Sequence, residues 1–377
     1  MTRGFLVVMT LLLAACGQQG DSNAPADAAV MPELVAADGT YPTKPLEKDE
    51  VVVKVIQHGV TNLQDAATVA EGLQNNLDVM VEFAERACSR GRKPDFLLYN
   101  EFPLTGYSRG TRDEKLQFTI EIPGPETAAL GEVARTCDTY IIFGSYARDA
   151  EWPGHILSIN TVIGRDGEVA AKFWKTRNVK RLIPGEEIPT TTIEGVRDRY
   201  RERYGVAAEF PVLQTEYGNI AVSTVQLDPF VFAAFAMRGV EIMFRTATLF
   251  AQEDVKAIAR FNNFYSAMSN ITFPPDSPAA PMGGDSLIVA PNGEVLAEAK
   301  GNVETIIEAT IPIAKLREGR RLPRYPFGVV EPVYSQYVDE VPVNHLDLPA
   351  EELPQTRETM FDLINASSRW LHSPDSE

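Results

Sequence analysis

The stretch FLLYNEFPLTGY, residues 96–107, combines a buried strand with an abrupt polar turn, and the fold is best deduced from it. Its first four residues are apolar and typical of a strand buried on both faces. The strand breaks at Asn100-Glu101, and Pro103 and Gly106 mark a loop after it. Glu101 is therefore a candidate functional carboxylate, although a lone acidic residue at a strand end is more often an exposed charge or an ion-pair partner.

Strands and helices alternate on both sides of this stretch. Before it lie the β-branched run Val51 to Gln57 and an apolar repeat from Leu73 to Cys88, which predicts a helix ending at 89–91. After it, the patterns predict helices at 125–136, near 237 and at 254–265, and strands at 140–144, 159–163, 169–174, 220–225, 240–244, 286–290 and 295–299. The charged stretch 192–206 predicts a solvated helical insertion, and the last ~50 residues predict an extended tail with a short helix. The alternation predicts an α/β fold with mixed sheets.

Composition limits the function classes. The chain has 377 residues and a net charge of −17, from 35 Lys plus Arg against 52 Asp plus Glu. Such an acidic chain repels phosphate backbones, so we expect no nucleic-acid partner. Three cysteines without CxxC spacing and four scattered histidines predict neither a disulfide framework nor a metal site. We expect Cys88 and Cys137 to be small buried thiols, since free cysteines are usually found in cores.

The N-terminus has the pattern of an export signal. An apolar run, Phe5 to Leu13, follows Arg3 and is too short to span a bilayer as a mature helix. It ends in Leu13-Ala14-Ala15-Cys16-Gly17, which resembles a bacterial lipobox whose cysteine, Cys16, is lipidated. The alternative is an ordinary cleaved signal in which Cys16 is incidental. We therefore expect a signal peptide at 1–15, a tether at 16–50, a domain at 51–322 and an extension at 323–377. Gly17 favours the outer membrane, facing the periplasm, by resemblance to sorting signals.

Several landmarks, in order, resemble the nitrilase superfamily, the carbon–nitrogen hydrolases. They are Gln57 at a strand end, Leu97 to Tyr107, Asn160 to Lys175, Arg238 to Ile242, Ala259 to Asn270 and Asp285 to Glu294. The resemblance covers roughly residues 50–320. It implies an α-β-β-α four-layer sandwich, a homodimer, no cofactor and a small amide- or nitrile-like ligand.

The resemblance also assigns roles to two residues. In this family a cysteine thiolate attacks an amide or nitrile carbon, and water resolves the covalent intermediate. The family's glutamate, a general base, corresponds to Glu101, and its lysine, which stabilises developing negative charge, corresponds to Lys175. The plain alternative for both residues is a buried ion pair.

The family's cysteine has no counterpart in this chain. Counting from Gly218 puts the nucleophile position at Val225, aligning on Asp228 puts it at Gln226, and counting back from Arg238 puts it at Ser223. Ser223 and Thr224 are possible substitutes. Either hydroxyl, however, would lie two residues, ~6.6 Å, short of the strand-end position, which is Val225 as counted for Ser223 and Gln226 as counted for Thr224. Asp228 is a candidate acid, but a lone Asp after a strand is more often a cap or turn residue.

Three functions remain open. The first is a catalytically altered or inactive member that binds a small ligand beside Glu101 and Lys175, and the missing thiol favours it. The second is an active amide hydrolase that uses Ser223, Thr224 or a water molecule as nucleophile. The third is an envelope interaction scaffold that meets its partner through residues 192–206 or the tail. All three share the fold, because fold does not imply activity.

Overall fold

Two six-stranded sheets form the centre of the computed structural model, which describes residues 34–107, 110–178, 190–336 and 348–367. The first sheet has the order β12 (Thr305–Ile311), β1 (Val51–Gln57), β2 (Phe96–Leu98), β3 (Tyr140–Ala147), β4 (Leu157–Ile163), β5 (Val169–Trp174). The second has the order β11 (Val295–Glu298), β10 (Leu287–Val289), β9 (Tyr265–Asn270), β8 (Ile242–Ala247), β7 (Gly218–Val222), β6 (Leu213–Thr215). Parallel pairs, β1–β2–β3 and β7–β8–β9, lie at the centre of each sheet, and antiparallel strands flank them.

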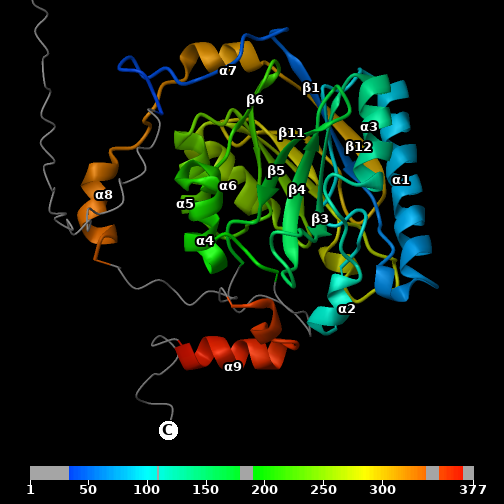
Figure 1. Cartoon of the computed structure of the whole chain (residues 1–377). Coiled ribbons are helices and arrows are strands. Elements are labelled where there is room, and N and C mark those ends of the chain that lie inside the picture. Colours follow the sequence, from blue (N-terminus) through cyan, green and yellow to red (C-terminus); the bar gives the residue numbers. More distant parts are fainter. Residues whose placement is uncertain (1–33, 108–109, 179–189, 337–347, 368–377) are drawn as a thin grey trace, which may run out of the picture.

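Helices cover the outer face of each sheet, which gives four layers (Figure 1). Helices α1 (Val69–Ser89) and α3 (Pro125–Cys137) lie on the first sheet, and α5 (Pro229–Met237) and α6 (Gln252–Asn262) lie on the second. The largest apolar cluster includes inward-facing residues of both sheets, with the Phe96 and Phe244 ring centroids 5.2 Å apart. A second apolar cluster joins the first sheet to α1 and α3. The expected α-β-β-α sandwich is therefore confirmed.

The sequence patterns missed three strands and misplaced several boundaries. Strands β6, β9 and β12 had no predicted counterpart, and the helix expected to reach residue 265 ends at Asn262, where Asn263 adopts φ 52°. Strand β9 (YSAMSN) is fully buried although half of it is polar, because its hydroxyl and amide groups bond to neighbouring segments. Strand β7 ends at Val222, not at 225. This last difference changes the interpretation of the candidate site.

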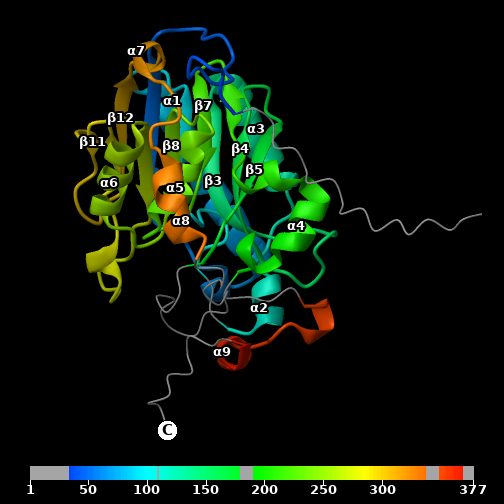
Figure 2. The same cartoon turned by 90° about the vertical axis from the view of Figure 1, so that its left-hand side faces the viewer.

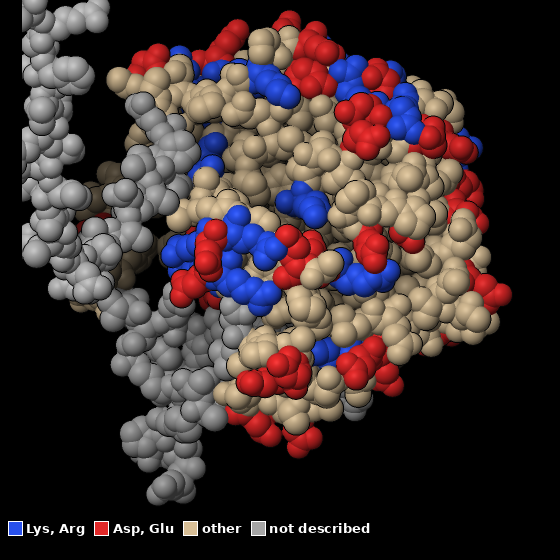
Figure 3. Space-filling view, in the orientation of Figure 1, with Lys and Arg blue, Asp and Glu red and all other residues tan. Residues whose placement is uncertain are grey.

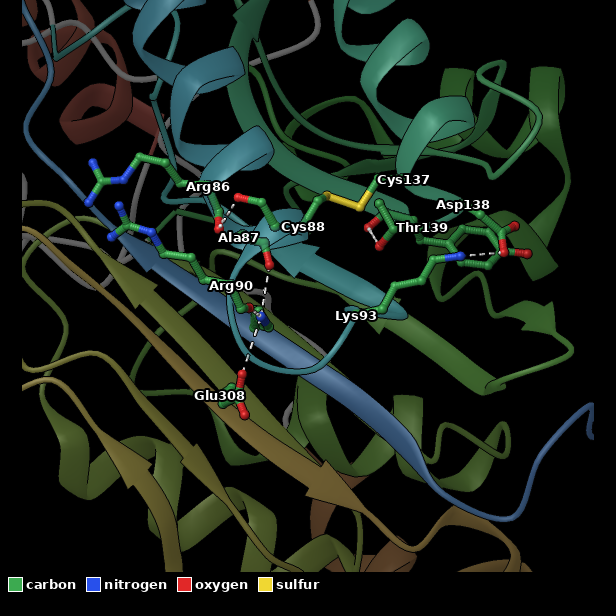
Figure 4. The surroundings of a disulfide bond; sticks show 12 residues. Arg86, Ala87, Cys88, Arg90, Lys93, Cys137, Asp138, Thr139 and Glu308 are labelled. Carbon is green, nitrogen blue, oxygen red and sulfur yellow. Dashed lines mark hydrogen bonds and ion pairs between the residues drawn. A yellow bond between two sulfur atoms is a disulfide. The ribbon is translucent and has the colours of Figure 1, made fainter.

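The prediction of two free buried thiols was wrong, because Cys88 and Cys137 form a disulfide (Figure 4). Helices α1 and α3 lie side by side on one face of the first sheet, and their C-terminal ends meet. The two Cα atoms are 5.9 Å apart across 49 residues of sequence. Nothing in the local sequence around either cysteine shows that the two helix ends converge.

Charged residues of the predicted insertion are paired. The stretch forms α4 (Arg197–Tyr204), which buries Tyr200 and lays Arg199 4.0 Å from the Trp152 ring centroid. Glu209 accepts hydrogen bonds from Arg197 and Arg201. Basic and acidic side chains are interspersed on this side of the molecule (Figure 3). The insertion is thus a helix that packs on the domain through Tyr200 and pairs arginines of its polar face with nearby carboxylates.

Both ends of the described chain pack on the domain. The hydroxyl of Tyr41 donates to Glu241 at 2.8 Å, and the amide of Glu47 donates to the carbonyl of Glu216 at 3.0 Å, so ordered structure begins before Val51. Helix α7 (Ile313–Gly319) follows the last strand, and α8 (Phe327–Tyr334) lies beside the body (Figures 1 and 2). Helix α9 (Arg357–Ser367) lies next to α2 (Arg112–Leu116) in both views.

The predicted signal peptide and Cys16 lie outside the described residues. Within the ranges given above, no helix has both the length and the apolar character needed to cross a membrane.

Candidate active site

Glu101 lies where the two sheets meet at the carboxyl end of β2. Its amide donates to the carbonyl of Ala247, at the end of β8, over 3.5 Å, and the preceding carbonyl of Asn100 accepts from Gly144 at 3.1 Å. The side chain is buried, with the residue 4 % exposed. The backbone of Glu101 is therefore held by one strand from each sheet.

Lys175 reaches the same carboxylate from the end of β5. Its Nζ lies 3.3 Å from Glu101 Oε1, and its backbone amide donates to the carbonyl of Ser158 on β4 at 3.0 Å. The Lys175 side chain keeps some exposure, at 17 %, whereas the Glu101 side chain has 6 %. The structure thus brings together the two residues that the family resemblance assigned.

Thr224 is the third residue at this carboxylate. Its Oγ1 donates to Glu101 Oε1 at 2.9 Å, and the residue is buried. Because β7 ends at Val222, residue 224 lies beyond the strand end and not two residues short of it. Thr224 is therefore the residue of this turn whose hydroxyl contacts the Glu101 carboxylate, and Val225 and Gln226 follow it along the turn.

The neighbours of Thr224 are oriented differently. Ser223 Oγ accepts a hydrogen bond from the amide of Val225 at 3.2 Å, and so it serves the turn. Val225 is fully buried and packs in the large apolar cluster. Gln226, half-buried, follows in the turn before the exposed Leu227, which adopts φ 55°. Of the two candidate hydroxyls, the one bonded to Glu101 is that of Thr224.

Asp228 is a helix cap, as its position after a strand suggested. Its Oδ1 accepts from the amides of Phe230 at 3.0 Å and Val231 at 3.2 Å, at the start of α5. Its other oxygen pairs with Arg177. Arg177 comes two residues after Lys175, so this ion pair ties the chain bearing the lysine to the turn bearing Thr224. Sequence reasoning missed Arg177, and its closeness to Lys175 was the one available signal.

A buried arginine on β8 contacts the same turn. Arg245, on β8, is fully buried, donates to the carbonyl of Val225 and lies 3.1 Å from Asp254. Its guanidinium is also 4.2 Å from the Phe232 ring centroid. Burial lowers the pKa of Arg245, and Asp254 opposes that shift by favouring the charged form. No periodicity in the sequence distinguishes this arginine from an exposed one.

The arrangement has the parts of a nucleophilic hydrolase site. A hydroxyl donates to a carboxylate, which is the geometry in which a base removes a proton from a nucleophile. An ammonium group beside that carboxylate is suited to stabilise negative charge on a substrate oxygen. These are the groups that a hydrolase of the nucleophilic class requires, and here a hydroxyl and an ammonium group meet at one buried carboxylate.

Comparison with known proteins agrees with this class. The model of the carbon–nitrogen hydrolase family matches residues 56–321, well over half of the chain. The chain therefore belongs to the carbon–nitrogen hydrolase family.

Two curated relatives are similar over about half of the chain. The omega-amidase NIT2 of Xenopus tropicalis is 28 % identical over 214 residues, covering 54 % of this chain and 72 % of that protein. The human omega-amidase NIT2 is 27 % identical over 214 residues, covering 54 % and 73 %.

Solved structures of an amidase from Nesterenkonia sp. AN1 share the fold. A double mutant in complex with acrylamide superimposes with a TM-score of 0.54 at 19 % identity, covering 78 % of this chain and 98 % of that one. Another mutant of that amidase carries the acetamide moiety of fluoroacetamide on its active-site cysteine, with a TM-score of 0.50 at 18 % identity, covering 76 % and 97 %.

Proposed function

We propose that this protein hydrolyses the carbon–nitrogen bond of a small amide, with the Thr224 hydroxyl as the nucleophile. The observation that carries the proposal is the hydrogen bond from Thr224 Oγ1 to Glu101 Oε1, with Lys175 Nζ 3.3 Å from the same oxygen. This is the second of the three functions left open by the sequence, an active amide hydrolase with a hydroxyl nucleophile in place of a cysteine.

The reaction balances with these three side chains. Glu101 accepts the Thr224 proton as Oγ1 forms a bond to the amide carbon, and Lys175 stabilises the resulting oxyanion. The carbon–nitrogen bond then breaks, and Glu101 returns the proton to the leaving amine, which leaves an ester on Thr224. Water, deprotonated by Glu101, hydrolyses the ester, and the proton goes back to Thr224 Oγ1.

A second candidate is ligand binding without turnover. The absence of a cysteine from the turn after β7 favours it, because a hydroxyl ionises far less readily than a thiol of pKa ~8.5. Glu101 and Lys175 would still bind a small amide- or nitrile-like ligand. The third function, an envelope scaffold, is less favoured, because the arginines of α4 are already paired with Glu209 and Glu151.

Substitutions at Thr224 separate hydrolysis from binding. We expect purified protein to release ammonia from simple aliphatic amides and Thr224→Val to lower that rate at least ~10³-fold. Thr224→Ser should keep activity, and Thr224→Cys should raise it because a thiolate forms more easily. Glu101→Gln should abolish turnover. Ser223→Ala is the matched control, since its hydroxyl serves the turn, and it should keep most of the activity.

Two results would count against a threonine nucleophile. Equal ammonia release by wild type and Thr224→Val would exclude it and leave an activated water. No release by wild type, together with amide binding in calorimetry that Glu101→Gln weakens, would establish the binding function instead. Mass spectrometry of a quenched reaction should detect the acyl group on the peptide that contains Thr224.

We also propose that the protein is a lipoprotein of the bacterial envelope, anchored through Cys16. The disulfide between Cys88 and Cys137 supports export, because such bonds persist in oxidising compartments and are rare in the cytosol. Metabolic labelling with palmitate should mark the wild type and not Cys16→Ala. An unlabelled wild type would overturn the anchor.

A homodimer is proposed as the assembly. Exposed apolar side chains lie together on α5 and α8, where the ring centroids of Phe230, 60 % exposed, and Tyr334, 48 % exposed, are 5.4 Å apart. Such patches are uncommon on monomers. Light scattering on the chain lacking residues 1–16 should give twice the monomer mass. A monomeric mass would refute the dimer.

A further inference from the structure

The C-terminal segment, residues 348–360, returns to the end of the first sheet that bears Glu101. Arg112, at the start of α2, binds this segment. Its backbone amide donates to the carbonyl of Gln355 and its Nε donates to the carbonyl of Pro354, both at 2.8 Å. Arg112 and Leu353 are both buried. Residues 348–360 lie beyond the family match, which ends at 321. This contact is therefore an addition to the family domain.

Met360 ends the segment in a small apolar cluster that contains the residue after Glu101. The side chain of Met360 is fully buried with Phe102, Tyr146 and Ile156. The Phe102 and Tyr146 rings stack with centroids 4.2 Å apart. Lys115 Nζ lies 4.1 Å from the Tyr146 centroid on the α2 side. Phe102 is thus packed between β3 and a segment nearly 260 residues away in sequence.

The backbone of Phe102 is tied to the residue that precedes Glu101. The Phe102 amide donates to Asn100 Oδ1 at 3.1 Å, so the two residues on either side of Glu101 are joined across it. A shift of Phe102 would move this turn and with it the carboxylate that faces Thr224. Misplacing a reacting group by about 1 Å costs ~10²-fold in rate. A cavity beside Phe102 is therefore expected to affect catalysis as well as stability.

We infer that Met360 is a positioning residue, which holds the Asn100–Phe102 turn and through it the carboxylate of Glu101. The C-terminal segment is accordingly part of the active-site architecture. The kinetic consequence rests on the proposed hydrolase function, whereas the structural consequence, a loosened turn, does not.

The test compares Met360→Ala with two other variants of the full folded protein. Met360→Leu keeps the apolar volume and should behave as wild type. Met268→Ala removes an equally buried methionine from β9, in the other sheet, and controls for lost stability. Hydrogen exchange of peptides covering residues 99–107 should be at least ~10-fold faster in Met360→Ala than in the wild type or Met268→Ala. On an amide substrate, kcat should fall ~10–100-fold in Met360→Ala with KM little changed.

Equal exchange of residues 99–107 in the two alanine variants would overturn the inference, whether or not the protein is an enzyme. An inactive wild type with faster exchange in Met360→Ala would refute the hydrolase function and leave the positioning role supported. Faster exchange with an unchanged kcat would overturn the link from the turn to Glu101.

Discussion

Gly144 sets how closely β3 approaches the backbone of Glu101. A Cβ atom at this position would lie 2.3 Å from the Glu101 carbonyl oxygen, a separation that steric repulsion forbids. Because Gly144 has no side chain, its backbone can lie close to the Glu101 carbonyl, and its amide donates to the carbonyl of Asn100. The position of the candidate base therefore depends on the absence of a methyl group on the neighbouring strand.

Gly144→Ala should consequently displace Glu101. We expect a loss of roughly 1–3 kcal/mol in stability from overpacking and about 10²-fold in amide hydrolysis. Gly328→Ala is the control, since nothing lies within 4 Å of its Cβ position on α8. Denaturant unfolding and ammonia release measure the two effects. An active, fully stable Gly144→Ala protein would contradict this account of the turn.

At the scale of elements, the site depends on where strands stop and helices start. Strand β7 ends two residues before Thr224, and α5 begins at Pro229 with Asp228 as its cap. The intervening turn is held from three directions: by the cap, by Arg177 and by Arg245. Asp228, which the sequence analysis treated as a lone residue, thus belongs to a set of contacts that supports a single turn.

The outer helices α1 and α3 are joined by the Cys88–Cys137 disulfide, whose contribution to stability can be measured. Removing the disulfide in a Cys88→Ala/Cys137→Ala protein should cost about 2–4 kcal/mol of unfolding free energy, because the 49-residue loop gains freedom in the unfolded chain. Guanidinium unfolding tests this. A reducing agent should lower the wild type to the level of the double variant and leave that variant unchanged. A wild type insensitive to reduction would argue against the bond.

At the scale of the whole molecule, burial of two histidines makes stability depend on pH. Burial lowers the pKa of His58 to about 4, and burial with nearby Arg199 lowers the pKa of His155 to about 4. The unfolded chain takes up these protons near pH 6.5, before the folded protein does. Stability from each histidine is therefore present above pH 6.5 and lost as the pH falls toward 4.

Each histidine should cost about 2 kcal/mol at pH 5 relative to pH 8. Unfolding measured by denaturant between pH 8 and pH 4.5 should show this decline, and His58→Gln should make it shallower. An unchanged slope in His58→Gln would show that His58 is not the group responsible. Asp138, whose pKa Arg165 holds at about 2, does not titrate in this range.

Local patterns were enough to predict the fold class, and the family resemblance assigned two of the three residues of the candidate site. The apolar run Val51 to Gln57 reflects a strand buried on both faces, and the repeat along α1 reflects a helix buried on one face. Both patterns are local properties of their segments. Glu101 and Lys175 follow strands that local patterns locate well. Three other features could be found only in the three-dimensional structure. They are the place of Thr224 beside Glu101, the Cys88–Cys137 bond and the packing of Met360. Each depends on a contact between residues 49 to about 260 positions apart. No local periodicity encodes such contacts, because they form only when elements distant in sequence pack against one another.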